Sequence, residues 1–361
     1  MCVAFIALAS ASSTSAVRVL VAFNRDEDYE RPTKSLHEWE PLLEEDGDTT
    51  RVNKVVVVGG RDTKCGGTWM AQCRRTGRWA LLTNSAASAK EEGGKGTTTT
   101  VPPENVRTRG ELVTGYLTGD LDGKAYAMEV FARRFNYDGF NLVVGDARGE
   151  DVYYVGNRGR ANVDTPSRLA QGKVYGLANE VLDSPWPKVL NGKAKMEEIM
   201  ADYSRFGVDD DLPTFSLQEA VLRDVLHAPY DDEKVHQRRS LSEINDEDEN
   251  GETNDVLDVQ VDEDDEEAPE VVVEQIEPHE SSVSFVRPGE LPGRPNTGTR
   301  SSQVFIISAN GRCFWRELNF SPKPDSSRRE SVPVGSLSRA VSVQDVGCAS
   351  FRLVAGVNPI A

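Results

Sequence analysis

The sequence predicts an α+β fold built from layers. Short apolar runs of strand length occur in pairs separated by turn residues, which is the pattern of antiparallel hairpins. Segments with apolar residues at helical spacing lie mainly in the middle third of the chain. Strict alternation of strand and helix is absent, as are GxGxxG and P-loop motifs, so a parallel nucleotide-binding sheet is not expected.

The expected elements follow from this patterning. The strands, in chain order, are Val3–Leu8, Val17–Phe23, Lys54–Val58, Thr68–Gln72, Trp79–Thr83, Asn141–Gly145, Val152–Val155, Val174–Leu177, Gln303–Ser308 and Cys313–Glu317. The helices are Arg109–Leu117, Ala125–Phe135, Lys188–Tyr203 and Leu217–Leu226. Ala86–Val101 is Gly- and Thr-rich and is expected to be a mobile loop.

The first 16 residues have two interpretations. Their apolar run and small residues resemble a signal peptide, but a positively charged n-region is missing and the run Val3–Ala9 is at the lower limit of length. The alternative is a buried strand, a Ser-rich turn and a second strand. We favour the strand because the n-region is missing.

One segment carries the excess negative charge. Between Glu243 and Glu280 there are 18 Asp and Glu residues and no Lys or Arg, and in the rest of the chain acidic and basic residues are equal in number. Such a composition buries too little apolar surface to offset the entropy of ordering. We therefore expect a single domain over residues 1–320, interrupted by a disordered acidic insertion at 236–295 and followed by a loosely ordered tail at 321–361.

Composition excludes several classes of function. The net charge of −18 argues against a nucleic-acid binder. Every apolar run is far shorter than the roughly 18–20 residues of a membrane span. The five cysteines are odd in number and form no CxxC pair, and the four histidines show no metal-ligand spacing, so neither a disulfide framework nor a metal or other cofactor is expected. The sequence does not specify an oligomeric state.

Cys2 is the most informative single residue. A small residue at position 2 permits removal of the initiator Met, which would leave a chain that begins with Cys. Such a residue carries a nucleophile and a base together, because an α-amine with a pKa of about 7.7–8.0 can take the thiol proton. The alternative is a small buried hydrophobic residue without chemistry.

Asn24-Arg25-Asp26-Glu27 follows the second expected strand directly. An Arg beside a thiol favours the thiolate, and an Asp can orient an α-ammonium group, so Arg25 and Asp26 are candidate partners of Cys2. The alternative is a solvated turn with a local ion pair worth about 0–1 kcal/mol.

Three further polar residues stand at the ends of expected strands. Asn84 and Asn179 each follow a buried strand, where a side-chain amide can donate to a developing oxyanion or can cap local backbone. Arg300 opens a late strand and could pair with a substrate anion or with Asp26, or lie on the surface.

A series of motifs in fixed order resembles the NRDE family, also called the Transport and Golgi organisation 2 family. They cover residues 1–230 and 296–320 and leave out the acidic insertion and the tail. The matching segments are Met1-Cys2, Asn24–Glu27 with Arg31-Pro32, Gly66–Trp69, Leu82–Asn84, Arg109–Val113, Tyr137–Leu142, Gly156–Gly159, Tyr175–Asn179, Pro185–Lys188 and Gly298–Arg300.

This resemblance implies a four-layer αββα sandwich of the N-terminal nucleophile hydrolase type. Hydrolases of that class use a terminal Cys, an Arg and an Asp, two Asn and a late Arg, in the order of the six site residues predicted here. Those residues are Cys2, Arg25, Asp26, Asn84, Asn179 and Arg300. Asp28 is an alternative to Asp26, because the hydrolases space their Arg and Asp as R-x-x-D.

The resemblance leaves three classes of function open. The first is an amide or thioester hydrolase acting on a small acyl ligand, and the second is a binding or transfer protein that holds a hydrophobic acyl or haem-like ligand without cleaving it. The third is a trafficking adaptor that works through the acidic insertion. The family name further suggests a cytoplasmic protein with peripheral Golgi association and a role in Golgi organisation and protein secretion.

Overall fold

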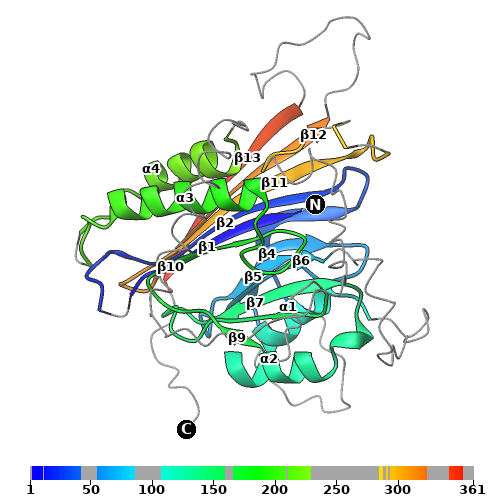
Figure 1. Cartoon of the computed structure of the whole chain (residues 1–361), viewed down its shortest axis with the longest axis horizontal. Coiled ribbons are helices and arrows are strands. Elements are labelled where there is room, and N and C mark those ends of the chain that lie inside the picture. The colour runs from blue at the N-terminus through cyan, green and yellow to red at the C-terminus, as the bar shows by residue number, and fades with distance from the viewer. Residues whose placement is uncertain are drawn as a thin grey trace, which may run out of the picture.

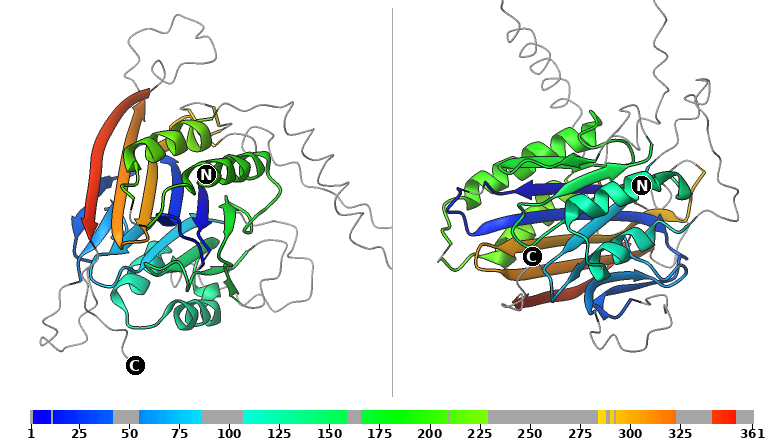
Figure 2. Two further views of the ribbon diagram at one scale, coloured as in Figure 1. Left: turned by 90° about the vertical axis from the view of Figure 1, so that its left-hand side faces the viewer. Right: turned by 90° about the horizontal axis from the view of Figure 1, so that it is seen from below.

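The computed structural model describes residues 2–10, 12–41, 55–85, 107–158, 166–208, 210–228, 284–287, 290–291, 293–322 and 341–352. The fold is α+β, as predicted. Two antiparallel sheets stack face to face, with α3 and α4 on the outer side of one sheet and α1 and α2 on the outer side of the other (Figures 1 and 2).

The first sheet has six strands in the order β10-β1-β2-β11-β12-β13. Their bounds are β1 Val3–Leu8, β2 Val17–Asp28, β10 Lys173–Leu177, β11 Thr297–Ser308, β12 Arg312–Pro322 and β13 Val341–Arg352. The predicted hairpins β1–β2 and β11–β12 are both present. Strand β1 lies between β10 and β2, which confirms the strand interpretation of Val3–Leu8.

The second sheet has seven strands in chain order from β3 to β9. Their bounds are β3 Thr33–Trp39, β4 Val57–Asp62, β5 Met70–Cys73, β6 Trp79–Asn84, β7 Phe140–Gly145, β8 Tyr153–Gly156 and β9 Ser167–Arg168. The helical elements are α1 Gly110–Thr118, α2 Gly123–Ala132, the 3₁₀ turn η3 Arg134–Asn136, α3 Pro187–Tyr203, α4 Thr214–Val221 and the π-helical turn η4 Leu222–Leu226.

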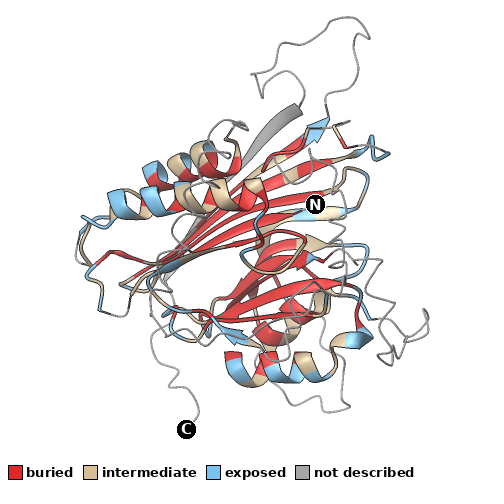
Figure 3. Cartoon of the chain, viewed as in Figure 1, coloured by how far each residue is buried: buried red, intermediate tan, exposed pale blue. Residues whose placement is uncertain are grey.

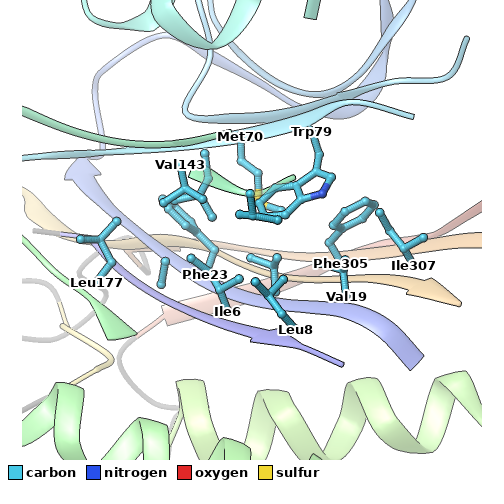
Figure 4. Packing of buried hydrophobic residues seen from close by; sticks show 14 of the residues in the cluster. Ile6, Leu8, Val19, Phe23, Met70, Trp79, Val143, Leu177, Phe305 and Ile307 are labelled. Carbon is cyan, nitrogen blue, oxygen red and sulfur yellow. The ribbon is translucent and has the colours of Figure 1, made fainter. Parts of the chain in front are cut away.

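The period of two in β1 decides which face each side chain takes. Ala4, Ile6 and Leu8 lie in the apolar layer between the sheets, whereas Val3 and Phe5 pack toward α3 and η4. Figure 4 shows Ile6, Leu8 and Phe23 facing Met70, Trp79 and Val143 of the second sheet. Cys2 shares the parity of Ala4 and therefore faces the inter-sheet layer.

The helices bury one side each against the sheets. α3 contacts β1 and β10, and α1 contacts β5, β6 and β7. In Figure 3 strands in the middle of each sheet, such as β1, β5 and β7, are buried along their length, while the outer sides of the helices are exposed.

Several predicted boundaries were wrong. Strand β2 does not stop at Phe23 but continues to Asp28, and the strand expected at Lys54–Val58 is Val57–Asp62. β3 and β9 were not predicted, because β3 is a polar edge strand and β9 has only two residues. The expected helix Leu217–Leu226 is divided into α4 and η4.

The C-terminal third also differs from expectation. Residues 341–352, expected to belong to a loose tail, pair with β12 as β13. Phe285 and Val286 fall within the insertion expected at 236–295, yet both are buried in the fold. Residues 236–283 of the acidic insertion and the loop at Ala86–Val101 lie outside the described residues, so the disorder of the first and the mobility of the second stay predictions.

Candidate functional site

Cys2 forms part of the wall of a small pocket between the two sheets. The pocket has a volume of about 110 Å³ and lies where the ends of β2 and β6 meet the start of α1. Cys2 is 7% exposed. The residues that line the pocket are Cys2, Arg25, Asp26, Glu27, Arg31, Asp62, Cys65, Gly67, Thr68, Trp69, Leu82, Asn84, Thr108, Arg109 and Gly110.

Strand alternation divides the motif Asn24–Glu27 between two faces of the sheet. The motif lies inside β2 and not in a solvated turn, and Asn24, Arg25 and Asp26 are all buried. The Arg25 guanidinium lies over the Trp69 ring, 4.0 Å from its centroid, on the inter-sheet side. Asn24 faces the helices, where its Nδ2 donates to the carbonyl oxygens of Leu226 (2.9 Å) and Ser284 (2.8 Å). Arg25 is therefore a pocket residue, and Asn24 holds the surrounding fold together.

Asp26 contacts the thiol through its backbone carbonyl, while its carboxylate is bound by Thr299. The Cys2 Sγ donates to the Asp26 carbonyl oxygen at 3.9 Å, and Asp26 Oδ1 accepts from Thr299 Oγ1 at 2.6 Å. Burial raises the pKa of Asp26, and the charge of buried Lys188 opposes that rise. Asp28 does not line the pocket, and its Oδ1 accepts from the backbone N–H of Glu30. Of the two alternatives, Asp26 is the one that lines the pocket.

The electrostatics of Cys2 are mixed. Burial raises the pKa of the thiol, and the negative charge of Asp26 raises it further, whereas the positive charge of Arg25 lowers it. Arg25 is held near Glu27, with 3.7 Å between Nη2 and Oε2. The thiol is thus predominantly protonated at neutral pH and would need a base to become a thiolate.

Asn84 and Asn179 lie together, but they use their amides differently. Asn84 lines the pocket, and its side chain forms no hydrogen bond within the described part of the chain. Asn179 Nδ2 donates to the backbone carbonyl of Asn84 at 2.7 Å, and its Oδ1 is buried with no hydrogen-bond partner among the described residues. The geometry makes Asn84 the available side-chain donor, and Asn179 the residue that positions it.

Arg300 does not line the Cys2 pocket. Thr299 pairs with Asp26 and Ser301 with Arg25, so Arg300 is the extra residue of a β-bulge in β11. Its Nη1 donates to the backbone carbonyls of Asp28 and Arg31. Arg300 also lowers the pKa of Arg25, after the larger effect of burial. The late Arg therefore influences the pocket from outside it, through its charge on Arg25 and Glu27.

Comparison with known proteins identifies the family. A family model described as Transport and Golgi organisation 2 matches residues 1–322. The chain belongs to the Transport and Golgi organisation 2 family. It is 34% identical over 187 residues to the Transport and Golgi organization 2 homolog of Mus musculus and 35% identical over 187 residues to the homolog of Homo sapiens. Each match covers 50% of this chain and 57% of the relative.

A more distant relative is the Transport and Golgi organization protein 2 of Drosophila melanogaster, with 26% identity over 216 residues. That match covers 58% of this chain and 68% of the relative.

In this member of the family, sequence reasoning missed three features of the pocket. Arg109 is a second guanidinium in the lining, and its Nη1 donates to the Gly139 carbonyl at 2.8 Å. Trp69 is the ring beneath Arg25, a stacking that its motif did not predict. Gly67 and Gly110 touch through their backbones, since a Cβ on Gly67 would lie 2.5 Å from the Gly110 carbonyl carbon. All four residues belong to motifs of the family resemblance, so membership in those motifs was the sequence signal that could have identified them.

Within the described ranges, no group of three or more His, Cys, Asp or Glu side chains is arranged to hold a metal ion. Among the described residues, no helix is long and apolar enough to cross a bilayer.

Proposed function

We propose that the Cys2 pocket hydrolyses an amide or thioester bond of a small acyl ligand, with Cys2 as an N-terminal nucleophile. The observation that supports this most directly is that Cys2, the adjacent residues Arg25 and Asp26, and Asn84, which come from three separate parts of the sequence, line one pocket. A nucleophile, a carboxylate, a cation and an amide donor are the groups that acyl transfer needs. The stacked sheets with helices on both outer faces support the proposal that the fold is the αββα sandwich of that hydrolase class.

The first step depends on removal of Met1. The α-amine of Cys2 would then take the thiol proton, because the burial that raises the pKa of Cys2 leaves the thiol protonated without a base. Strand β1 pairs with β2 so that Val3 lies opposite Asn24, which brings the start of the chain beside Arg25 and Asp26. Asp26 would stabilise the resulting ammonium group, and Arg25 the thiolate.

In the second step, sulfur attacks the carbonyl carbon and the carbonyl π electrons move to oxygen. Asn84 would donate to this oxyanion, with Asn179 holding the Asn84 backbone in place. When the tetrahedral intermediate collapses, the amine or thiol leaving group takes the proton from the ammonium group. The α-amine then accepts a proton from water, whose oxygen attacks the thioester and releases the acid with Cys2 free again.

The biological role that the relatives' names suggest is Golgi organisation and transport. We extend that role to this chain as a proposal, together with a cytoplasmic, Golgi-associated location. Since the chain spans only 57% of the length of the mouse and human relatives, activity, ligand and location are all proposed for this chain alone.

One observation favours a second candidate, a protein that binds an acyl or haem-like ligand without cleaving it. Burial raises the pKa of the Cys2 thiol, and only 7% of Cys2 is exposed, which are properties of an inert thiol as much as of a nucleophile. In this case Met1 would be retained, and the pocket would bind its ligand with Cys2 as a wall residue.

The decisive experiment is intact-mass analysis of the purified chain, with and without a chloromethyl-ketone thiol probe, followed by mapping of the labelled peptide. The hydrolase proposal expects loss of Met1 and labelling of Cys2 before the other four cysteines. Cys65 is the matched control, because it is exposed and lines the same pocket. Cys2→Ser should abolish the first labelling event, and Cys65→Ser should leave it intact. Retention of Met1, or labelling of Cys65 with none at Cys2, would reject the hydrolase in favour of binding.

A further inference from the structure

A second cavity shares a wall with the Cys2 pocket. It has a volume of about 400 Å³, within the range of about 300–1,000 Å³ that is usual for small-molecule sites. Arg25 and Trp69 line both cavities, so their stacked pair forms the partition. On the far side of the partition, the cavity lies between the edge strand β3 and the ends of β11 and β12.

The lining of this cavity has an excess of positive charge. Arg25, Lys34 and Arg300 contribute three cations from three different strands, and Glu317 contributes the one carboxylate. Within the described ranges, neither Lys34 nor Arg300 forms an ion pair, and Arg25 is paired with Glu27 only at 3.7 Å. The formal excess is therefore about two positive charges at neutral pH.

The carboxylate of Glu317 interacts with Arg25, but its hydrogen bonds come from elsewhere in the protein. Glu317 is 1% exposed and its two oxygens accept from inside the protein, Oε2 from the Leu36 backbone N–H at 2.5 Å and Oε1 from Gln303 Nε2 at 2.6 Å. Burial also raises the pKa of Glu317. Arg25 and Arg300 meanwhile repel each other, as the lowered pKa of Arg25 shows after the larger effect of burial.

The cavity also has an unused polar group and apolar walls. Ser301 is 3% exposed, and its Oγ has no hydrogen-bond partner in the part of the chain that the structure describes, although buried hydroxyl groups are almost always paired. Trp69 and Phe320 supply aromatic surface beside it. A ligand that combines an anionic head with an apolar body would satisfy both the charges and the walls.

We propose that this cavity binds the phosphate group of a phosphate monoester. Such a group carries about −1.5 to −2 charges at pH 7 and three acceptor oxygens, which match an excess of two positive charges and donors on three strands. A carboxylate or sulfonate would neutralise only one charge. The guanidinium groups of Arg25 and Arg300 suit oxygen pairs on phosphate, and Lys34 adds a point charge at the rim. The proposal is independent of whether Cys2 is a nucleophile.

The test is isothermal titration calorimetry of the full chain with phenyl phosphate at pH 7.5. Benzenesulfonate is the matched monoanion, and inorganic phosphate is the matched head without a ring. The variants are Lys34→Gln and Arg300→Gln, with Lys124→Gln on an exposed position of α2 as the control. Circular dichroism verifies that each variant is folded.

Phenyl phosphate should bind at one site, and benzenesulfonate should bind more weakly. Each pocket variant should weaken phenyl phosphate binding at least about tenfold, since a hydrogen bond to a charged group is lost, and Lys124→Gln should leave it unchanged. If inorganic phosphate binds as tightly as phenyl phosphate, the site takes the free ion, and tighter binding of phenyl phosphate identifies an ester.

The proposal is overturned if phenyl phosphate gives no saturable heat, or if it binds no better than benzenesulfonate. It is overturned equally if folded Lys34→Gln and Arg300→Gln bind like the control.

Discussion

Replacing Asn24 by Ala should destabilise the fold strongly even though Asn24 does not line the Cys2 pocket. Asn24 is fully buried and makes three hydrogen bonds. Nδ2 donates to the Leu226 and Ser284 carbonyls at 2.9 and 2.8 Å, and Oδ1 accepts from Ser302 Oγ at 2.6 Å. These bonds join β2 to the end of η4, to the segment that leads into β11, and to β11 itself.

The magnitude follows from the groups left without partners. Truncation to Ala leaves the Leu226 and Ser284 carbonyls without the Asn24 donor in a buried site, at a cost of about 1–3 kcal/mol each, whereas Ser302 Oγ keeps His227 Nε2 as a partner at 2.9 Å. Allowing for partial relaxation, we expect Asn24→Ala to lower the free energy of unfolding by about 4 kcal/mol. Ser302→Ala leaves the Asn24 amide in place and should cost about 2 kcal/mol. The double variant should cost less than the sum, because the two residues share one of the bonds.

Urea unfolding followed by tryptophan fluorescence measures this, since Trp79 and Trp315 are fully buried. The m-value should stay unchanged while the midpoint falls. Asn136→Ala is the matched control, because Asn136 is exposed, and it should change stability by less than about 0.5 kcal/mol. An Asn24→Ala protein as stable as this control would refute the assignment of Asn24 as a structural clamp.

Three further predictions concern charge and packing. Burial lowers the pKa of His227 to about 4, so the folded chain resists protonation of this residue. The free energy of unfolding should therefore fall by up to about 3 kcal/mol as the pH drops from about 6.5 to about 4. Urea midpoints measured across this range should fall less in His227→Gln than in the wild type. Arg25→Met removes a charge that lowers the pKa of Cys2, so iodoacetamide should alkylate Cys2 more slowly at a given pH. An unchanged alkylation rate, measured by peptide mapping, would contradict the placement of Arg25. Gly67→Ala places a Cβ 2.5 Å from the carbonyl carbon of Gly110 and should lower the free energy of unfolding by about 1–3 kcal/mol. A urea midpoint equal to that of the wild type would count against this close approach.

Local patterning was sufficient for most of the first sheet. The apolar runs at Val3–Leu8 and Gln303–Ser308 have strand length and are bounded by turn residues, and both form strands. The polar edge strand Thr33–Trp39 could not be found this way, because one-sided exposure at a sheet edge weakens the apolar signal. β13 was not predicted either, because its pairing with β12 is a tertiary contact that local patterning does not reveal.

The candidate site shows the same division. Ordered motifs pointed to Cys2, Arg25, Asp26 and Asn84, and the structure places all four around one pocket. They could not show that Arg300 lies in the neighbouring cavity, because a single extra residue in β11 shifts its register relative to β2.

The sequence by itself determined the α+β class, the hairpins and the family, because these depend on local periodicity and on short motifs in order. Tertiary structure alone decided the roles within the motif Asn24–Glu27. Alternation along β2 turns Arg25 toward Trp69 and Asn24 toward Leu226, and both partners are distant in the chain. Which faces of a strand meet a pocket or a helix depends on how the two sheets stack, and that arrangement arises only when the whole chain is folded.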